Sequence, residues 1–240
     1  MAGQLRLDKY LADMGLGTRS EIKEWIRKGR VMLNETVCKK PESKVVVGID
    51  LVSFDHQLVE YVQNQYIMLH KPSGVVSATN DNVSETVLDL IAEKSSKNLF
   101  PVGRLDKDTE GLLLLTNDGD LAHRLLSPKK HVDKVYYAKV RGKVTLEDKE
   151  AFLQGVDIKD DDLTMPAVLK ILVSDEISEV ELTLQEGRFH QVKRMFEAVG
   201  KEVIYLKRLS MGSLILDPSL KPGEYRELTQ EELSELKKGK

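Results

Sequence analysis

The most unusual stretch of this 240-residue sequence is an acidic loop at residues 103–111, which is bounded by glycines and followed by four leucines. Within the loop, Arg104 stands two residues before Asp106, so a carboxylate and a cation lie together beside an expected buried strand. A carboxylate in such a place can act as a nucleophile, and a neighbouring cation favours its ionised form. The loop is therefore a candidate for catalysis.

Two other interpretations of this loop stay open on the residues alone. Asp106, Asp108 and Glu110 imitate the first half of an EF-hand calcium loop, but the twelfth position is Asn117 and not a bidentate Glu. A surface turn with solvated acids is the ordinary explanation of an isolated acidic loop. Arg104 would then form a structural ion pair with an acid of the same loop.

The segments around the loop predict a sheet with helices packed on it. Periodicity of two residues and β-branched content predict strands, and a period of 3.6 predicts helices. The expected strands are 66–69, 112–115, 135–140, 167–173, 180–184 and 203–206, and the expected helices are 84–92, 118–126, 145–154 and 190–199. Because strands and helices do not alternate regularly, we expect an α+β fold with a mixed, mainly antiparallel sheet and flanking helices.

The first 60 residues predict a smaller unit with two helices and a β-hairpin. Leu7, Leu11 and Met14 recur at helical spacing. Residues 18–21 (Thr-Arg-Ser-Glu) form a capping box for a second helix that ends near Gly29. Short strands are expected at 31–33 and 45–52, with a turn at 34–35. The polar stretch 53–65 is the expected linker, which gives domains at 1–60 and 61–240.

Basic side chains follow one face of the second helix. Arg19, Lys23 and Arg27 are spaced four residues apart and form what we call the basic stripe. The apolar residues Ile22, Trp25 and Ile26 turn toward a core. Such a stripe can track a nucleic-acid backbone, although a charge run is as often a solvated helix face.

The net charge of −3 argues at first against a nucleic-acid partner. Residues 1–50, however, hold ten basic and seven acidic residues, a net charge of +3, which leaves −6 for the rest of the chain. The longest aliphatic run, 112–115, is far shorter than the roughly 20 residues of a membrane span. The single cysteine, Cys38, excludes an internal disulfide, and no signal peptide is visible. We expect a cytoplasmic monomer without a membrane partner.

The N-terminal motifs resemble a known module. Residues 6–11 (Arg-Leu-Asp-Lys-Tyr-Leu), a Gly-x-x-x-Arg-Ser motif and residues 26–34 (Ile-Arg-Lys-Gly-Arg-Val-x-Leu-Asn) are similar to the small RNA-binding domain first seen in a ribosomal small-subunit protein. Glu35 stands where that family often has Gly, which affects the hairpin turn more than the binding face. The resemblance implies RNA contacts from the basic stripe and from four further residues, namely Arg6, Ser20, Lys28 and Arg30.

The rest of the chain resembles the bacterial ribosomal RNA pseudouridine synthases, and most closely the branch that modifies small-subunit (16S) RNA. Four motifs carry this resemblance in order: residues 66–74, residues 103–112 (Gly-Arg-Leu-Asp-x-x-Thr-x-Gly-Leu), residues 133–136 (Asp-Lys-Val-Tyr) and residues 186–195. Residues 222–226 (Pro-Gly-Glu-Tyr-Arg) also favour the small-subunit branch. A large-subunit (23S) RNA enzyme, or a non-catalytic RNA-binding assembly factor on the same scaffold, is the alternative.

The resemblance implies roles for four residues in the isomerisation of uridine to pseudouridine. Asp106 is the nucleophile, and Lys193 pairs with it. Tyr136 packs against the uracil and serves as a base for the final proton removal, whereas Tyr137 lies on the opposite strand face. Arg104 occupies the gap left by the extruded base or holds its phosphate. No cofactor and no metal is expected.

Overall fold

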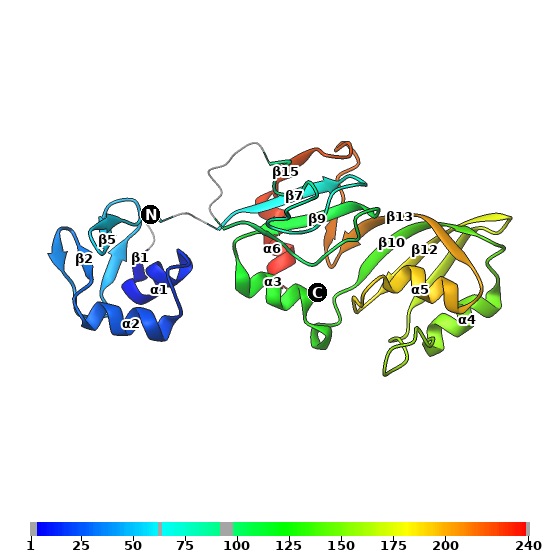
Figure 1. The fold of residues 1–240 in the computed structure, drawn as a ribbon, viewed down its shortest axis with the longest axis horizontal. Helices are drawn as coiled ribbons and strands as arrows, with labels where there is room; N and C mark the ends of the chain where they lie inside the picture. The colour runs from blue at the N-terminus through cyan, green and yellow to red at the C-terminus, as the bar shows by residue number, and fades with distance from the viewer. Residues whose placement is uncertain (1–3, 62–63, 92–97, 239–240) are drawn as a thin grey trace. The chain divides into compact units, whose positions relative to one another are not determined.

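The computed structural model describes residues 4–61, 64–91 and 98–238 and divides the chain into two compact units, Met1–Gln63 and Asn64–Lys240 (Figure 1). Each unit has its own hydrophobic core, and every contact reported below lies within one unit. In the described ranges, no helix has both the length and the apolar character that a membrane span needs.

The N-terminal unit packs two short helices against small antiparallel sheets. Its elements are β1 (Gln4–Arg6), α1 (Leu7–Asp13), α2 (Arg19–Arg27), β2 (Val31–Leu33), β3 (Thr36–Val37), β4 (Lys44–Val46), β5 (Val52–Phe54) and β6 (Gln57–Leu58). β1 pairs with β4, and the other four strands form a sheet in the order β3-β2-β5-β6. The fully buried side chains at the centre include Leu7, Leu11, Ile22 and Ile26, as the helical spacing predicts.

The local signals of this unit are confirmed. Thr18 accepts a hydrogen bond from the backbone N–H of Glu21, whose carboxylate accepts one from the backbone N–H of Thr18, so the capping box forms. Asn34 and Glu35 both have positive φ angles, of 49° and 64°, at the turn between β2 and β3. Positive φ at both central residues is the geometry of a type I′ hairpin turn, which Glu35 adopts without the usual glycine. The expected strand at 45–52 is instead two strands, β4 and β5, which lie in different sheets. The linker expected at 53–65 was wrong in its first part, because β5 and β6 extend the N-terminal sheet to Leu58.

The C-terminal unit is built on one mixed sheet in the order β11-β12-β10-β13-β9-β7-β15, with β8 and β14 paired at its margins. The strands are β7 (Tyr66–Lys71), β8 (Phe100–Pro101), β9 (Glu110–Thr116), β10 (Lys134–Arg141), β11 (Val168–Val173), β12 (Ile177–Leu184), β13 (Glu202–Met211), β14 (Leu214–Ile215) and β15 (Tyr225–Glu227). The pairing of β13 with β9 is parallel and the other named pairings are antiparallel, so the predicted mainly antiparallel sheet is confirmed.

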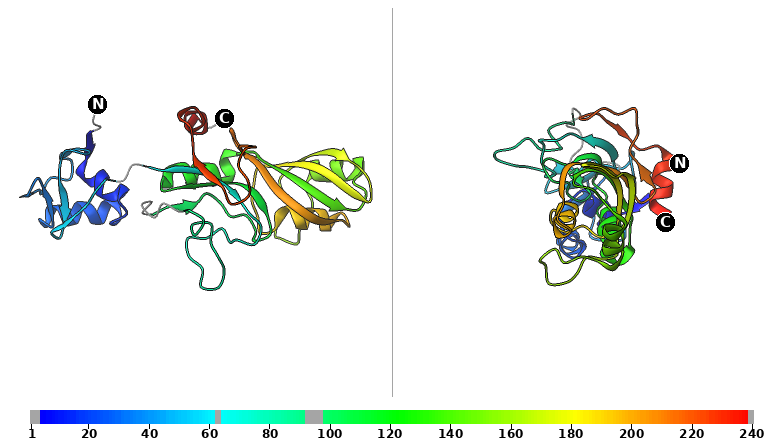
Figure 2. Two further views of the ribbon diagram at one scale, coloured as in Figure 1. Left: turned by 90° about the horizontal axis from the view of Figure 1, so that it is seen from above. Right: turned by 90° about the vertical axis from the view of Figure 1, so that its right-hand side faces the viewer.

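Helices cover both faces of this sheet (Figure 2). They are α3 (Gly119–Leu126), the 3-10 turn η1 (Pro128–Lys130), α4 (Leu146–Gln154), α5 (Gln191–Ala198) and α6 (Gln230–Lys238). Leu113 and Leu115 of β9 join a core with α4 and α5, whereas Leu112 and Leu114 join a second core with α3 and α6. The four consecutive leucines therefore pack into the cores on both faces of the sheet, because successive side chains of a strand point to opposite sides.

One helix prediction was wrong. Residues 84–91 form turns, and residue 92 lies outside the described residues. Both the backbone N–H and the hydroxyl of Thr86 donate to the Asp89 carboxylate, and Val76 forms a β-bridge with Thr86. Such local side-chain bonds compete with helix formation. The apolar spacing there reflects Val87 and Ile91, which reach the core from turns. β15 and α6 were not predicted.

Candidate active site

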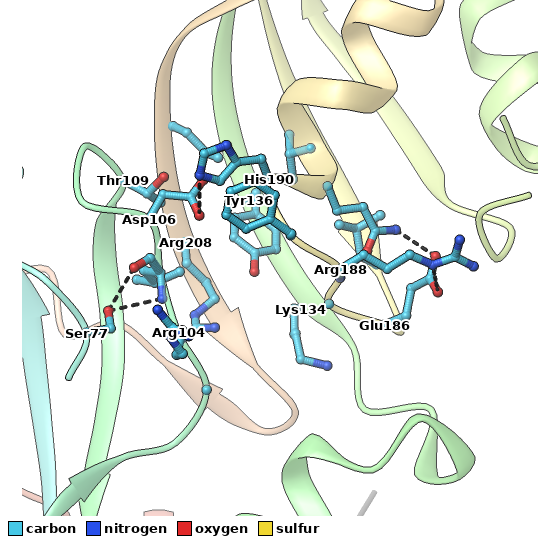
Figure 3. A pocket seen from close by; sticks show the side chains of 18 of the residues that line it. Ser77, Arg104, Asp106, Thr109, Lys134, Tyr136, Glu186, Arg188, His190 and Arg208 are labelled. Carbon is cyan, nitrogen blue, oxygen red and sulfur yellow. Dashed lines mark hydrogen bonds and ion pairs between the residues drawn. The ribbon is translucent and has the colours of Figure 1, made fainter. Parts of the chain in front are cut away.

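A pocket of about 690 Å³ opens where the acidic loop, β10, β13 and the segment before α5 meet (Figure 3). The residues that line it include three of the four expected catalytic residues, namely Arg104, Asp106 and Tyr136. The fourth, Lys193, reaches Asp106 from α5. Figure 3 shows the labelled side chains converging from segments far apart in the sequence.

The loop that carries Asp106 is held by the last residue of β7 and by the turn that follows it. The fully buried Lys71 donates from Nζ to the carbonyl oxygens of Pro72, Lys107 and Thr109, at 3.0, 3.2 and 2.8 Å. Burial lowers the pKa of Lys71 to about 8. The Gly74 N–H also donates to the Lys107 carbonyl at 2.8 Å. The first of the four motifs thus fixes the backbone on either side of Asp108.

A second anchor holds the other side of Asp106. The Ser77 hydroxyl donates to the carbonyl oxygen of Leu105 at 2.9 Å and accepts from the Leu105 N–H at 3.1 Å. Both residues are buried, and the Thr109 N–H closes a turn onto the Asp106 carbonyl at 3.1 Å. The half-buried Asp106 side chain is therefore presented to the pocket from a backbone fixed on both sides.

The loop ends where β9 meets β13, at a glycine that the geometry requires. Gly111 has φ +105°, and a Cβ on it would lie 2.3 Å from the carbonyl oxygen of Arg208. Its parallel partner in the sheet is Arg208 itself. Only glycine combines this φ with so close an approach of another backbone. The contact fixes β13, and with it the Arg208 side chain, beside the acidic loop.

Asp106 has two basic neighbours. Lys193 Nζ lies 3.5 Å from Asp106 Oδ2, and His190 Nε2 lies 3.6 Å from Asp106 Oδ1. His190 begins α5 with a positive φ of 49° and stacks on Phe189, with ring centroids 3.8 Å apart. Phe189 remains 75% exposed at the edge of the pocket.

Lys193 makes its hydrogen bonds to Asp108. Its Nζ lies 2.6 and 2.7 Å from the two carboxylate oxygens of Asp108, closer than to Asp106. Partial burial acts to raise the pKa of Asp108, but the hydrogen bonds and charge of Lys193 outweigh it and hold this pKa below its usual value. Lys193 is thus shared between two carboxylates, an arrangement that the motif alone does not reveal.

Tyr136 lies on β10 with only 9% of its surface exposed, inside the pocket. Its cross-strand partner is Arg208 of β13, and the two therefore project from the same face of the sheet. Tyr137 projects from the opposite face and packs edge-on against Tyr205. This contact agrees with a structural role for Tyr137.

Arg104 is exposed and lines the pocket. Within the described ranges it forms no ion pair, so the alternative of a structural ion pair inside the loop is not what the structure contains. Its guanidinium is left available to a ligand of the pocket.

The fourth motif forms a polar frame on the opposite wall. The buried Glu186 carboxylate accepts from Arg188 Nε at 3.0 Å, from Gln191 Nε2 at 2.7 Å and from the Met165 N–H at 2.9 Å. The Arg188 guanidinium also donates to the carbonyl oxygens of Asp162 and Leu163. This frame fixes the turn that leads into His190 and α5.

The sequence matches two known protein families. Residues 65–198 match the family described as RNA pseudouridylate synthase, and residues 5–48 match the S4 domain.

The chain belongs to the RNA pseudouridine synthase family. Such enzymes are isomerases, and an S4 domain is an RNA-binding module.

Individual relatives align over nearly the whole pseudouridine synthase chain. An "Uncharacterized RNA pseudouridine synthase" of Bacillus subtilis is 49% identical over 95% of this chain and 97% of its own. The "Ribosomal small subunit pseudouridine synthase A" of Escherichia coli is 39% identical over 96% and 99%. A solved structure titled "Crystal structure of pseudouridylate synthase" superposes with a TM-score of 0.69 at 38% identity, over 97% of this chain and 99% of that one.

The basic residues of the synthase's S4 domain fall into two groups. Arg6 pairs with Asp8, Lys28 with Glu24 and Arg30 with Asp55, so these three cations already have intramolecular partners. Arg30 also lies over the rings of Trp25 and Phe54.

The basic stripe has no such partners. In the described part of the chain, Arg19, Lys23 and Arg27 form no ion pair, and Arg19, Arg27 and the neighbouring Ser20 are exposed on α2. The stripe is therefore the part of the predicted RNA-binding set whose charge is least compensated.

The sequence left several pocket residues without a role. Lys71 stands within the first of the four motifs, but only the structure shows that it donates to two carbonyl oxygens of the acidic loop, those of Lys107 and Thr109. Lys134, two residues before Tyr136, and the distant Arg208 both line the pocket although they are buried. The sequence signal for Arg208 is weak, because its neighbour in β13, Lys207, is also basic.

Proposed function

We propose that this pseudouridine synthase isomerises one specific uridine of small-subunit (16S) ribosomal RNA to pseudouridine. Its relatives named for the ribosomal small subunit, in Escherichia coli and in Vibrio species, are 39–41% identical over almost the full chain. The observation that carries the proposal is the pocket itself, where Asp106 lies within ion-pair distance of Lys193 and His190.

In this proposal Asp106 is the group that breaks the bond between uracil and ribose. The carboxylate must be ionised to react, and the Lys193 ammonium lies 3.5 Å from it, with His190 Nε2 at 3.6 Å on its other oxygen. The hydrogen bonds that anchor Leu105 and Lys107 limit the movement of the loop, so Asp106 is held ready before the RNA arrives. No cofactor and no metal takes part.

Tyr136 supports the extruded base. A uracil inside the pocket would stack on its ring, which already faces the cavity, and the hydroxyl can accept the proton that the product base must lose. The exposed, unpaired Arg104 fits a role at the pocket entrance, either in the space that the extruded base leaves or on its phosphate.

The two domains have different tasks, with residues 1–60 as the RNA-docking domain and 61–240 as the catalytic domain. Arg19, Lys23, Arg27 and Ser20 are the primary RNA contacts, and the ion-paired Arg6, Lys28 and Arg30 add to them. We propose that the protein acts as a monomer. Bacterial ribosomes assemble in the cytoplasm, and we place the reaction there.

The test is to incubate the protein with small-subunit RNA, large-subunit RNA and early assembly particles of each, and to map pseudouridine by carbodiimide-blocked primer extension. We expect one new stop in the small-subunit RNA, in naked or particle-bound form. A stop confined to large-subunit RNA would contradict the small-subunit target. No stop in any sample would contradict catalysis and favour an assembly factor.

A further inference from the structure

Two buried cations line the pocket without an anion to balance them. Arg208 is 2% exposed and Lys134 is 6% exposed. Arg208 Nε donates to the Leu112 carbonyl at 2.8 Å, whereas its Nη2 is buried without any hydrogen-bond partner in the described residues. Lys134 Nζ donates to the Val132 carbonyl at 3.0 Å. We call Arg208 and Lys134 the cationic pair.

The nearest acids are committed elsewhere. Asp133 and Glu186 both act electrostatically on Lys134, but neither lies within ion-pair distance of the cationic pair in the part of the chain that the structure describes. The Glu186 carboxylate is held by Arg188, and the Asp133 carboxylate accepts from Gln185 at 2.9 Å. The positive charge at the bottom of the pocket is therefore uncompensated.

Such an arrangement costs stability unless a ligand repays it. Buried charges without partners are strongly disfavoured, and two neighbouring like charges more so. Burial, and then the charge of Arg208, lower the pKa of Lys134, which shows that the two side chains act on each other. An anion placed between Lys134 and Arg208 would give each buried charge a partner and would offset the repulsion between the two cations. The structure is thus preorganised for negative charge.

The cationic pair lies next to the expected position of the base. Lys134 stands two residues before Tyr136 on β10, so both side chains project from one face about 7 Å apart along the strand. Arg208 is the cross-strand partner of Tyr136. Figure 3 shows Tyr136, Arg208 and Lys134 in the same pocket, so a uracil ring stacked on Tyr136 would have both cations near its carbonyl oxygens.

We propose that Arg208 and Lys134 bind the carbonyl oxygens of the target uracil and stabilise the negative charge that the ring acquires during the reaction. The proposal rests on the proposed function, which puts the uracil on Tyr136 beside Asp106. A phosphodiester is the other anion of RNA, but the burial of both cations favours the base, which must enter deepest.

The chemistry gives the ring negative charge by every route open to Asp106. If Asp106 attacks C1′, an oxygen–C1′ bond forms, the C1′–N1 bond breaks, and the electron pair leaves on the uracil. If it removes the C2′ proton, the C1′–C2′ double bond expels the same anion. If it adds to C6, an oxygen–C6 bond forms and the electron pair of the C5–C6 double bond moves onto O4 as an enolate. The C1′–N1 bond then breaks, C5 bonds to C1′, the carboxylate leaves C6, and N1 takes up a proton as C5 loses one.

The rest of the sequence balances without a further reactant. In the first route C5 of the anion bonds to C1′ and the carboxylate leaves; in the second the proton returns to C2′. In both, the C5 proton is finally lost and N1 gains one. The charge resides on N1, O2 and O4 until the new bond forms, and donors aimed at such oxygens lower the barrier most.

The first test compares Arg208→Gln and Lys134→Met with wild type in single-turnover pseudouridine formation at saturating enzyme. The matched controls are Arg141→Gln and Lys139→Met, exposed residues of β10 that pair with Glu202 and Glu179 outside the pocket. We expect each pocket variant to be about 100-fold slower, with unchanged RNA affinity and unaffected controls. Unchanged rates at saturation with weakened affinity would overturn the proposal and indicate a phosphodiester contact.

A second test needs no turnover. Barbiturate is a planar anion with the shape of the departing uracil, and its binding can be compared with that of neutral uracil by calorimetry. We expect wild type to bind barbiturate at least tenfold more tightly than uracil, and both pocket variants to lose this preference. Equal binding of the two ligands by wild type would overturn the proposal.

The two tests separate this inference from the function on which it rests. Absence of pseudouridine with wild-type protein would contradict the proposed function, while barbiturate binding would still test the cationic pair. Lys134→Met removes a buried charge and should keep or raise the melting temperature, so a slow but stable variant cannot be explained by misfolding.

Discussion

Lys193 Nζ lies 2.6 Å from Asp108 Oδ1 and 3.5 Å from Asp106 Oδ2, so a single ammonium serves two carboxylates two residues apart on the same loop. The pKa of Asp108 is held below its usual value by this contact, after partial burial has acted against it. Asp108 therefore competes with Asp106 for the cation and weakens the support that the reactive carboxylate receives.

Replacement of Asp108 by Asn should release Lys193 to Asp106. The neutral amide no longer competes for the ammonium, so Asp108→Asn should keep its activity at neutral pH, whereas Lys193→Met, which removes the cation from both carboxylates, should be about 100-fold slower. The measurement is the single-turnover rate at pH 7, with Asp120→Asn, an exposed acid on α3, as the control. An Asp108→Asn variant as slow as Lys193→Met would show that the ion pair with Asp108, and not the one with Asp106, supports the reaction.

Lys71 should make stability depend on pH in an unusual direction. Its pKa is about 8 in the folded protein and 10.5 for the free group. Between these values the folded state has released a proton that the unfolded chain retains, so the free energy of unfolding rises with pH in this window.

The comparison is between wild type and Lys71→Met, by denaturant unfolding from pH 7 to pH 11. Above about pH 8, the free energy of unfolding of wild type should increase relative to that of the variant, by at most about 3 kcal/mol. If the free energies of unfolding of wild type and Lys71→Met change with pH in parallel, the buried amine does not titrate between pH 8 and pH 10.5. The variant should also lose activity, because two hydrogen bonds to the catalytic loop are gone.

Gly111 should be intolerant of a side chain. Gly111→Ala combines a φ of +105° with a Cβ 2.3 Å from the Arg208 carbonyl, and we expect a loss of about 2–5 kcal/mol in the free energy of unfolding. Gly119→Ala is the matched control, because a Cβ there meets nothing within 4 Å in α3. Similar stabilities for the two variants in denaturant titrations would contradict the contact between β9 and β13.

The basic stripe should carry more of the RNA affinity than the ion-paired cations. Joint replacement of Arg19, Lys23 and Arg27 by Gln should weaken binding and reduce the slope of log K against log salt by up to about 2–3. Lys28→Gln, whose cation already pairs with Glu24, should change binding less. Filter binding at several salt concentrations measures the RNA affinity and its salt dependence for the triple variant and for Lys28→Gln. An unchanged slope in the triple variant would identify the stripe as a solvated helix face.

Local features of the fold were predictable from sequence, because each depends on residues close together in the chain. The capping box at Thr18 and Glu21 and the alternation of β9 need only their own segments. The helix expected at 84–92 failed because Val87 and Ile91 are buried from turns, which gives the same apolar spacing as a helix.

The site was predictable only where a motif marked it. Asp106, Tyr136 and Arg104 face one pocket, as the motifs imply. The preference of Lys193 for Asp108 depends on where α5 lies relative to the loop, and the meeting of Lys134 with Arg208 depends on the register of β10 and β13 across some seventy residues. Distances of this kind are set by tertiary packing, and no local pattern encodes them.

The central claim is that the Asp106 carboxylate performs the isomerisation. Its most direct test is pseudouridine mapping on small-subunit ribosomal RNA with wild type and with Asp106→Asn, a variant of nearly the same shape, at equal RNA occupancy. We predict that the variant binds RNA as wild type does and is slower by at least about 1,000-fold. Pseudouridine formed by Asp106→Asn at a rate close to that of wild type would contradict this account.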